Sequence, residues 1–308
     1  MPGVMASSRP KQWIISGSAI SAVALWGLAF PLTQDALTSF SPIILGFLRF
    51  AIASAIFGLF MLLTYSLSEI RDTIMKERWS LLLLGALYVT IPNITQNYGL
   101  VHGTSSVASV IQSSGPVMTL LFAVLLLRER MTSMKVIGSA VAMAGTVLLV
   151  AHGNISLEDE SFVSNLLIFI SATSYGLAWV SAKKMMNSSP PILIIGLALV
   201  FGTAMLALAV PFEQTPMTDF TLSSTANLLI LGIFCAGLSS WLYLRSLEHE
   251  EVSRMAFFIY LMPVFASAFA WIIRDEGVAM WTALCAVVIV IGIIIAERRP
   301  RTIRASGK

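Results

Sequence analysis

The sequence predicts an all-α polytopic membrane protein of ten transmembrane helices, built as two inverted five-helix repeats. Three observations predict this class: hydrophobic residues make up 57% of the 308 residues, charged residues make up only 11%, and long apolar runs recur along the chain. Soluble domains carry charge on about 25% of their residues, so this chain has too little polar surface for a sphere in water. The composition also excludes intrinsic disorder, which requires low hydropathy and high net charge.

Ten apolar segments, each bounded by charged residues, Pro or Gly, are the predicted spans. A helix needs about 20 apolar residues to cross about 30 Å of hydrocarbon, and lipid offers no partners to unpaired backbone groups. The first segment is longer than a signal-peptide core and is expected to be retained as a span. The predicted spans are 12–34, 41–66, 79–101, 104–127, 133–151, 162–182, 190–211, 225–247, 252–273 and 278–296.

The basic residues predict the orientation, because short loops rich in Lys and Arg stay on the cytoplasmic side. All but two of the 19 basic residues fall in the termini and in alternate loops, on one side of the predicted topology. The exceptions are Arg274, in a loop on the other side, and Arg49, inside a span. Both tails, 1–11 and 297–308, are therefore expected in the cytoplasm, and the pI of about 9.0 reflects topology rather than nucleic-acid binding.

The two halves of the chain align with each other at an offset of 147 to 149 residues. The segment from Trp26 to Phe30 aligns with that from Tyr175 to Trp179, and the spacing of Pro116, Glu129, Gly138 and Gly145 recurs at Pro263, Glu276, Cys285 and Gly292. We therefore expect two five-helix domains, 12–151 and 162–296. Since five is odd, the second domain must cross the membrane in the opposite sense, as in secondary transporters with a site between their halves.

The order and spacing of these motifs resemble the drug/metabolite transporter superfamily, specifically proteins with two EamA domains. The residues that carry the resemblance are Trp26, Gly27, Phe30, Pro116, the Leu-Arg-Glu-Arg run at 127–130, Gly138 and Gly145. The second half departs from the pattern at Cys285, where the family usually has Gly, and at 274–276. The resemblance implies a metabolite exporter of the bacterial inner membrane, most similar to the aromatic amino-acid exporters, with a cavity surrounded by helices 1–4 and 6–9.

Amides gather on two neighbouring predicted helices. Asn93, Gln96 and Asn97 have the spacing of one helix face, and Gln112 lies on a matching polar face of the next span with Ser109 and Ser113. Two such faces favour the lining of a cavity. The alternative is hydrogen bonding between helices, a common role of such residues in membranes.

Arg49 is the charged residue predicted to lie deep in a span. An Arg at the centre of a span costs about 2.5 to 3.5 kcal/mol on insertion scales, so it is expected to face the bundle interior. Its planar guanidinium could bind a substrate carboxylate through two parallel hydrogen bonds. The alternative is structural, with Arg49 tying its helix to backbone carbonyls or to the neighbouring amides.

Aromatic residues occupy equivalent places in the two halves. Trp26 and Phe30 pair with Tyr175 and Trp179 in the alignment, so that both pairs should meet at the interface between the repeats and stack on a substrate. Packing alone is the alternative. Tyrosines and a hydroxyl elsewhere extend the candidate site: Tyr88, Tyr260, Tyr243 and, on the same helix face as Tyr243, Ser240. Trp13 and Trp79 fall at membrane edges, where aromatic anchors are common.

The sequence lacks the signatures of several other functions. No Asp, Glu or His lies deep in a predicted span, so proton coupling is unsupported, and no Walker motif is present for ATP. No enzyme activity, metal or cofactor is expected. The preferred function is a secondary transporter exporting neutral or aromatic amino acids by alternating access, as a monomer or homodimer, with membrane lipid and a small-molecule substrate as its partners. The alternatives are a drug or sugar-phosphate and nucleotide-sugar transporter, or a non-transporting receptor or assembly subunit.

Overall fold

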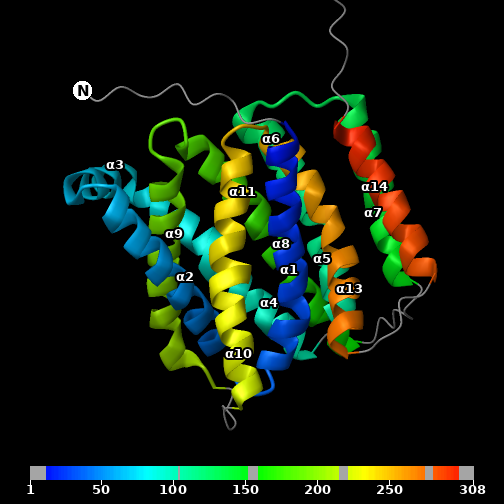
Figure 1. Cartoon of the computed structure of the whole chain (residues 1–308), viewed down its shortest axis with the longest axis horizontal. Coiled ribbons are helices and arrows are strands. Elements are labelled where there is room, and N and C mark those ends of the chain that lie inside the picture. The colour runs from blue at the N-terminus through cyan, green and yellow to red at the C-terminus, as the bar shows by residue number, and fades with distance from the viewer. Residues whose placement is uncertain (1–11, 103–104, 152–158, 215–220, 275–279, 298–308) are drawn as a thin grey trace, which may run out of the picture.

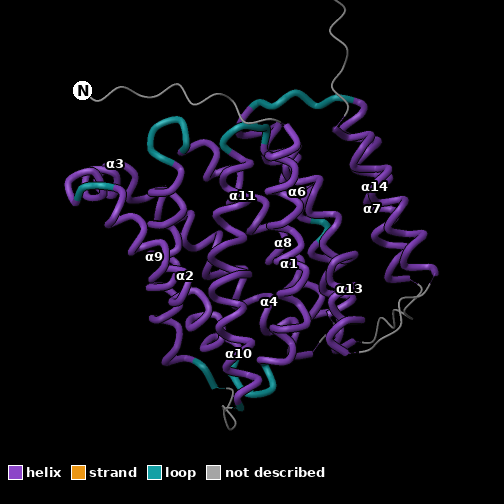
Figure 2. Tube along the Cα trace, viewed as in Figure 1, coloured by secondary structure: helices purple, strands orange, loops and turns teal. Residues whose placement is uncertain are grey.

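The computed structural model describes residues 12–102, 105–151, 159–214, 221–274 and 280–297. Helices make up nearly all of these ranges, and no strand occurs within them (Figure 2). Six helices are long and apolar enough to cross a membrane: 12–36, 42–64, 162–185, 191–212, 222–247 and 252–273. Large apolar side chains on their outer surfaces, such as Leu63 and Leu208, are 77% and 74% exposed, which suits contact with lipid rather than water.

The helices follow one another as an up-and-down bundle (Figure 1). The first half contains α1 Gln12–Ala36, α2 Pro42–Thr64, α3 Leu67–Gly85, the π-helix η1 Ala86–Thr90, α4 Ile91–His102, α5 Ser105–Gln112, α6 Gly115–Leu127 and α7 Ser133–Ala151. The second half contains α8 Asp159–Met185, α9 Pro191–Ala209, η2 Val210–Phe212, α10 Leu222–Ile230, η3 Leu231–Leu238, α11 Ser239–Leu247, α12 Val252–Ala256, η4 Phe257–Leu261, α13 Met262–Arg274 and α14 Met280–Glu297.

One helix begins far from its predicted start. The third apolar segment was expected from residue 79, whereas α3 begins at Leu67. Ser66 and Glu69 form a capping box there: the Ser66 hydroxyl accepts a hydrogen bond from the Glu69 amide, and the Glu69 carboxylate accepts one from the Ser66 amide. The first part of α3 is polar, so a search for apolar runs does not detect it. This polar part ends near Trp79, whose side chain is 72% exposed.

Departures from regular α-helix recur at equivalent places in the two halves. The π-helices η1 (Ala86–Thr90) and η3 (Leu231–Leu238) lie about one repeat apart. Likewise, the turn between α5 and α6 at residues 113–114 matches the 3₁₀-helix η4 (Phe257–Leu261). Pro92 lacks the N–H that would bond the Tyr88 carbonyl, which accounts for the widened turns of η1. Such irregular segments often mark functional sites.

Close helix contacts interlock the two halves. α1 packs on α13 of the other half, and a Cβ added at Gly27 would lie 2.7 Å from the Cβ of Phe265. The equivalent α8 packs on α6 of the first half, and a Cβ at Gly176 would lie 3.1 Å from the amide nitrogen of Thr119. A side chain at either glycine would push these helices apart. The repeated glycine therefore maintains the interface between the halves.

The last helices of the two halves form a separate pair at the edge of the bundle, where α7 lies against α14 (Figure 1). A Cβ at Gly138 would lie 2.4 Å from the amide nitrogen of Ala296, and one at Gly292 would lie 2.5 Å from that of Ala142. The small-residue face of the fifth predicted span is thus covered within the chain.

Candidate functional site

A cavity lies in the interior of the bundle and is lined by residues of both halves. Its lining is mostly apolar with a few placed polar groups, as in small-molecule sites. The first half contributes Trp26, Ala29, Phe30, Arg49, Phe50, Tyr88, Gln96, Gln112, Gly115 and Thr119, and the second contributes Ala172, Tyr175, Gly176, Trp179, Cys235, Ala236, Ser240, Ile259 and Met262.

Aromatic rings form one end of the cavity. The aligned pairs from α1 and α8 all line it: Trp26 with Phe30, and Tyr175 with Trp179. The ring centroids of Trp26 and Trp179 are 5.9 Å apart, and Trp179 lies 4.9 Å from Tyr88 in an edge-on arrangement. These separations are those of favourable aromatic contacts, so the rings hold one another in place beside the open space.

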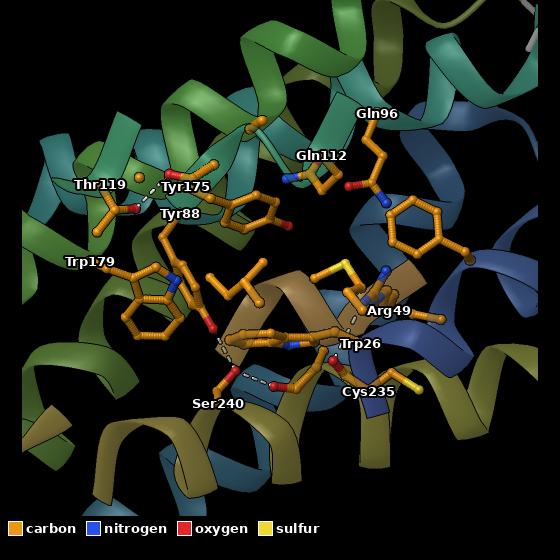
Figure 3. Close-up of a pocket in the computed structure, with 18 of the residues that line it drawn as sticks. Trp26, Arg49, Tyr88, Gln96, Gln112, Thr119, Tyr175, Trp179, Cys235 and Ser240 are labelled. Atoms are coloured by element: carbon orange, nitrogen blue, oxygen red, sulfur yellow. Dashed lines mark hydrogen bonds between the residues drawn. The ribbon is translucent and has the colours of Figure 1, made fainter. Parts of the chain in front are cut away.

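The opposite end of the cavity is polar. Figure 3 shows Arg49 and Gln96 on one side of the cavity, away from Tyr88 and Trp179, with Gln112 between Gln96 and Tyr175. Arg49 is only 6% exposed. It lies seven residues after Pro42, the first residue of α2, and hence about 10 Å along the helix at about 1.5 Å per residue. Its Nη2 donates a long hydrogen bond of 3.4 Å to the carbonyl of Cys235.

Two buried polar atoms at this end have no hydrogen-bond partner in the described part of the chain. They are Nε of Arg49 and Oε1 of Gln112. Within the same ranges no carboxylate lies within 4.0 Å of the Arg49 guanidinium. Burying a charge without a partner is unfavourable, so the Arg49 guanidinium leaves a donor suited to an anionic group, whereas Oε1 of Gln112 leaves an acceptor suited to a donor.

A hydrogen bond beside the cavity joins η1 to α11, the helix that follows η3. The Tyr88 hydroxyl of η1 lies 2.6 Å from that of Ser240, the second residue of α11 after η3, and the Ser240 hydroxyl also donates to the carbonyl of Ala236 (Figure 3). This is a direct hydrogen bond between the halves. The wide turns of η3 also turn the Cys235 carbonyl toward Arg49.

Four of the sequence-predicted site residues lie outside the cavity lining. Asn93 donates to the Val89 carbonyl at 2.7 Å, and Asn97 donates to the Pro42 carbonyl at 2.9 Å. The Asn97 amide thus bonds α2, and the Asn93 amide also donates to the Tyr175 hydroxyl of α8 at 3.5 Å. Both follow the alternative of hydrogen bonding within and between helices. Gln96 points to the cavity instead.

The other two are tyrosines. The ring of Tyr243 lies behind the lining, 5.0 Å from Trp26 and 4.5 Å from Trp179. Tyr260 is turned toward α7, where its hydroxyl lies 2.7 Å from that of Ser139. Tyr243 supports the aromatic wall from outside, whereas Tyr260 joins η4 to the peripheral helix pair.

Several lining residues were missed by sequence reasoning. Thr119 lies seven residues after Gln112, a spacing that helical periodicity could have linked to the polar face. Cys235 contributes through its backbone carbonyl, which no pattern of side chains reveals. Ile259 and Met262 line the cavity because of the tertiary packing of η4 and the start of α13, which the sequence pattern does not reveal.

Two polar clusters close the ends of the bundle around the cavity. At one end the carboxylate of Glu129, just after α6, accepts hydrogen bonds from the Val252 amide at 2.9 Å and from the Ser253 amide and hydroxyl. Lys135 of α7 lies 2.6 Å from Glu251 and 3.8 Å from Glu129. We call these five residues the Glu129 cluster; they tie the first half to the start of α12.

At the other end Glu213 joins the second half to the first. Its carboxylate accepts hydrogen bonds from the Ile43 amide at the start of α2, at 2.8 Å, and from the Tyr98 hydroxyl, at 3.0 Å. A carboxylate is stabilised at a helix N-terminus by free amides and the helix dipole. Each end of the bundle is therefore held by a carboxylate that crosses between the halves.

Comparison with known proteins relates this architecture to transporters. A family model, the EamA-like transporter family, matches the chain twice, at 13–151 and 163–297. An uncharacterized transporter of Archaeoglobus fulgidus is 28% identical over 94% of this chain and 99% of its own, and the uncharacterized transporter YvbV of Bacillus subtilis is 27% identical over 92% of each.

A probable terminal-alkyne amino-acid exporter of Streptantibioticus cattleyicolor is 25% identical over 82% of this chain and 84% of its own. One solved crystal structure superposes with a TM-score of 0.77 at 20% identity, over 92% of this chain and 96% of that chain, and so shares its fold. The two family matches together cover most of the residues and repeat in both halves. The chain belongs to the EamA-like transporter family, with two EamA repeats.

Proposed function

We propose that this protein is a secondary transporter of the bacterial inner membrane that exports small metabolites, neutral or aromatic amino acids foremost, by alternating access. The observation that carries the proposal is the cavity itself, because both halves line it with aromatic residues at equivalent positions, Trp26 and Phe30 from α1 and Tyr175 and Trp179 from α8. Sites of this kind, between two repeats near the midplane, are typical of secondary transporters.

The proposed topology has ten spans, two domains at 12–151 and 162–296 inverted with respect to each other, and both termini in the cytoplasm. In favour of it, α3–η1–α4, α5–α6, α7 and α14 occupy the predicted ranges beside the six long apolar helices. The excess of Lys and Arg in alternate loops gives the orientation. The Glu129 cluster then lies at the cytoplasmic end and Glu213 at the outer end.

Alternating access requires that the ends open in turn. In the described ranges both ends are tied, by Glu129 to Ser253 and by Glu213 to Ile43. These ties are hydrogen bonds of carboxylates, which can be exchanged for water when an end opens. The wide turns of η1 and η3 and the turn at 113–114 provide the bending points beside the cavity.

Amino acids are favoured as substrates by the arrangement of the lining. A flat apolar side chain could pack against the cluster of aromatic rings, and a carboxylate could lie beside Arg49. A relative named as a probable terminal-alkyne amino-acid exporter gives further support. The rival phosphorylated substrates would call for several cations, as phosphate sites usually provide, and Arg49 is the single cation among the described lining residues.

Flux measured in liposomes tests this function. Vesicles containing the purified protein would be loaded with unlabelled candidates and supplied outside with labelled Trp, Phe, Met, Ala or a nucleotide sugar. We expect saturable exchange of Trp and Phe, above that of protein-free vesicles. Binding without flux of any candidate would indicate the receptor function instead, and flux of the nucleotide sugar alone would overturn the amino-acid assignment.

A further inference from the structure

The charged groups that line the cavity are all of one sign, which bears on the kind of substrate that the cavity binds. Its described lining contains one full positive charge, on Arg49, and no Asp or Glu. An Arg side chain stays protonated in proteins. The protein groups that line the cavity are therefore cationic overall, and the charge is deep enough that bulk water and salt screen it weakly.

The guanidinium is also incompletely bonded. Of its five N–H groups, one makes the 3.4 Å bond to the Cys235 carbonyl, and Nε is buried without a partner. The Phe50 ring lies 5.4 Å from the guanidinium carbon, which leaves the group on an aromatic surface rather than in an ion pair. An anion bound here would gain a charge-assisted hydrogen bond and would satisfy a buried donor.

From these observations we infer that the cavity selects substrates by a carboxylate and is matched to apolar monocarboxylates of net negative charge, for which an α-ammonium group is dispensable. The carboxylate lies against Arg49, with the side-chain amides of Gln96 and Gln112 beside it, and the apolar body lies against the packed rings of Trp26 and Trp179. This inference rests on the proposed function in taking the cavity as the transport site.

The lining gives an ammonium group no charged partner, because the one side-chain acceptor without a hydrogen-bond partner among its described residues is neutral, Oε1 of Gln112. Its polar groups near the aromatic end are neutral, namely the hydroxyls of Tyr88, Ser240 and Thr119, and each of these already has a hydrogen-bond partner. A zwitterion would thus bring a positive charge into a cavity that already holds one. A deaminated acid of the same shape leaves the cavity neutral.

Four probes of nearly equal size separate these chemistries: 3-phenylpropionate, its uncharged isostere 3-phenylpropanamide, L-phenylalanine and L-phenylalaninamide. Binding would be measured on the purified full-length protein by intrinsic tryptophan fluorescence and calorimetry. We expect 3-phenylpropionate to bind at least about tenfold more tightly than 3-phenylpropanamide, the change that one charge-assisted hydrogen bond gives. We expect L-phenylalanine to bind no more tightly than 3-phenylpropionate.

Variants assign the selectivity to Arg49. In Arg49→Gln the acid and its amide should bind equally, and Arg49→Lys should restore part of the preference, because it keeps the charge but loses the planar fork. Arg245→Gln, which removes an exposed cation stacked on Trp241, is the matched control and should behave as wild type. Because the comparison of acid with amide is made first on the wild-type protein, a variant that fails to fold leaves the test intact.

The inference is overturned if the amide binds as tightly as the acid, or if folded Arg49→Gln keeps the preference for the acid. Flux assays in liposomes keep the two proposals apart. Preferential binding of the acid without flux of any probe would contradict the transport function alone, whereas equal flux of L-phenylalanine and L-phenylalaninamide would contradict carboxylate selection alone.

Discussion

The hydroxyls of Tyr88 and Ser240 lie 2.6 Å apart although 152 residues separate them in the chain. Tyr88 belongs to η1 and Ser240 is the second residue of α11, which follows η3, so the bond joins the two halves at the wall of the cavity. Both residues are buried. The bond therefore reports on how closely the halves meet in this conformation.

Replacing Tyr88 with Phe should weaken this contact without disturbing the rings. The Phe ring can keep its packing on Trp179, and the Ser240 hydroxyl keeps the Ala236 carbonyl as acceptor. We expect a loss of about 1 kcal/mol in the free energy of unfolding, typical of one hydrogen bond, measured by denaturation in detergent. Tyr65→Phe, at the end of α2, is the control. An unchanged stability in Tyr88→Phe would show that the bond does not hold the halves together.

Neutralising Glu129 should loosen the end of the bundle that it closes. The carboxylate accepts hydrogen bonds from Val252 and Ser253 and lies beside Lys135. Glu129→Gln substitutes an amide whose NH₂ group faces donors. Leaving such a buried polar group without a partner should lower the free energy of unfolding by about 1 to 3 kcal/mol. We expect faster hydrogen exchange at residues 252–255.

Asp72→Asn, at an exposed carboxylate on α3, serves as the control for that experiment and should leave exchange at 252–255 unchanged. If the amides of residues 252–255 exchanged at the wild-type rate in Glu129→Gln, the Glu129 cluster would not be responsible for closing this end of the bundle.

The start of α3 should depend on pH through Glu69. Hydrogen bonds from the Ser66 amide and hydroxyl lower the pKa of the Glu69 carboxyl below its ordinary value. A lowered pKa in the folded state stabilises this helix start above the ordinary Glu pKa of about 4.3, and that stabilisation is lost as the pH falls through the lowered value. Hydrogen-exchange protection at residues 67–70, corrected for intrinsic rates, should fall between pH 5 and pH 3.

Glu69→Gln should remove this dependence, because the amide does not titrate in that range. Protection that fell equally in the variant would assign the effect to another group.

The contact between α7 and α14 should depend on small residues. Disrupting this contact should lower stability but leave ligand affinity unchanged. A Cβ at Gly138 would meet the backbone of Ala296 at 2.4 Å, so Gly138→Val requires the helices to separate. Overpacking of this kind costs about 1 to 3 kcal/mol, which thermal unfolding would detect. Gly58→Val, at a position with no atom within 4 Å of the added Cβ, is the control. A large change in ligand affinity per folded molecule would contradict the peripheral role of this pair.

The sequence predicts the helix ranges well because long apolar runs leave little alternative to helix in lipid. It does not predict the start of α3, where a capping box rather than hydropathy extends the helix to Leu67. The π-helices are a further difference. Pro92 hints at η1, but η3 contains no Pro, and nothing in its side chains explains its wide turns.

The internal repeat was the most informative signal for the site. It brought Trp26, Phe30, Tyr175 and Trp179 together before any tertiary information, and all four line the cavity. Helical periodicity alone was less informative. It placed Asn93, Gln96 and Asn97 on one face, but a residue's direction also depends on the neighbouring helix: α2 lies close enough for Asn97 to bond Pro42, while Gln96 reaches the cavity.

The central claim is that substrate passes through the cavity between the halves. Counterflow of labelled Phe into liposomes tests it most directly when the cavity is filled from within by Ala172→Phe, with Leu208→Phe on the outer surface as the matched control. Both variants would first be shown to be folded and monodisperse. We predict that Ala172→Phe lowers the initial rate at least about tenfold, as loss of 1.4 kcal/mol or more in binding would, while Leu208→Phe retains the wild-type rate. Equal rates in the two variants would contradict a transport path through this cavity.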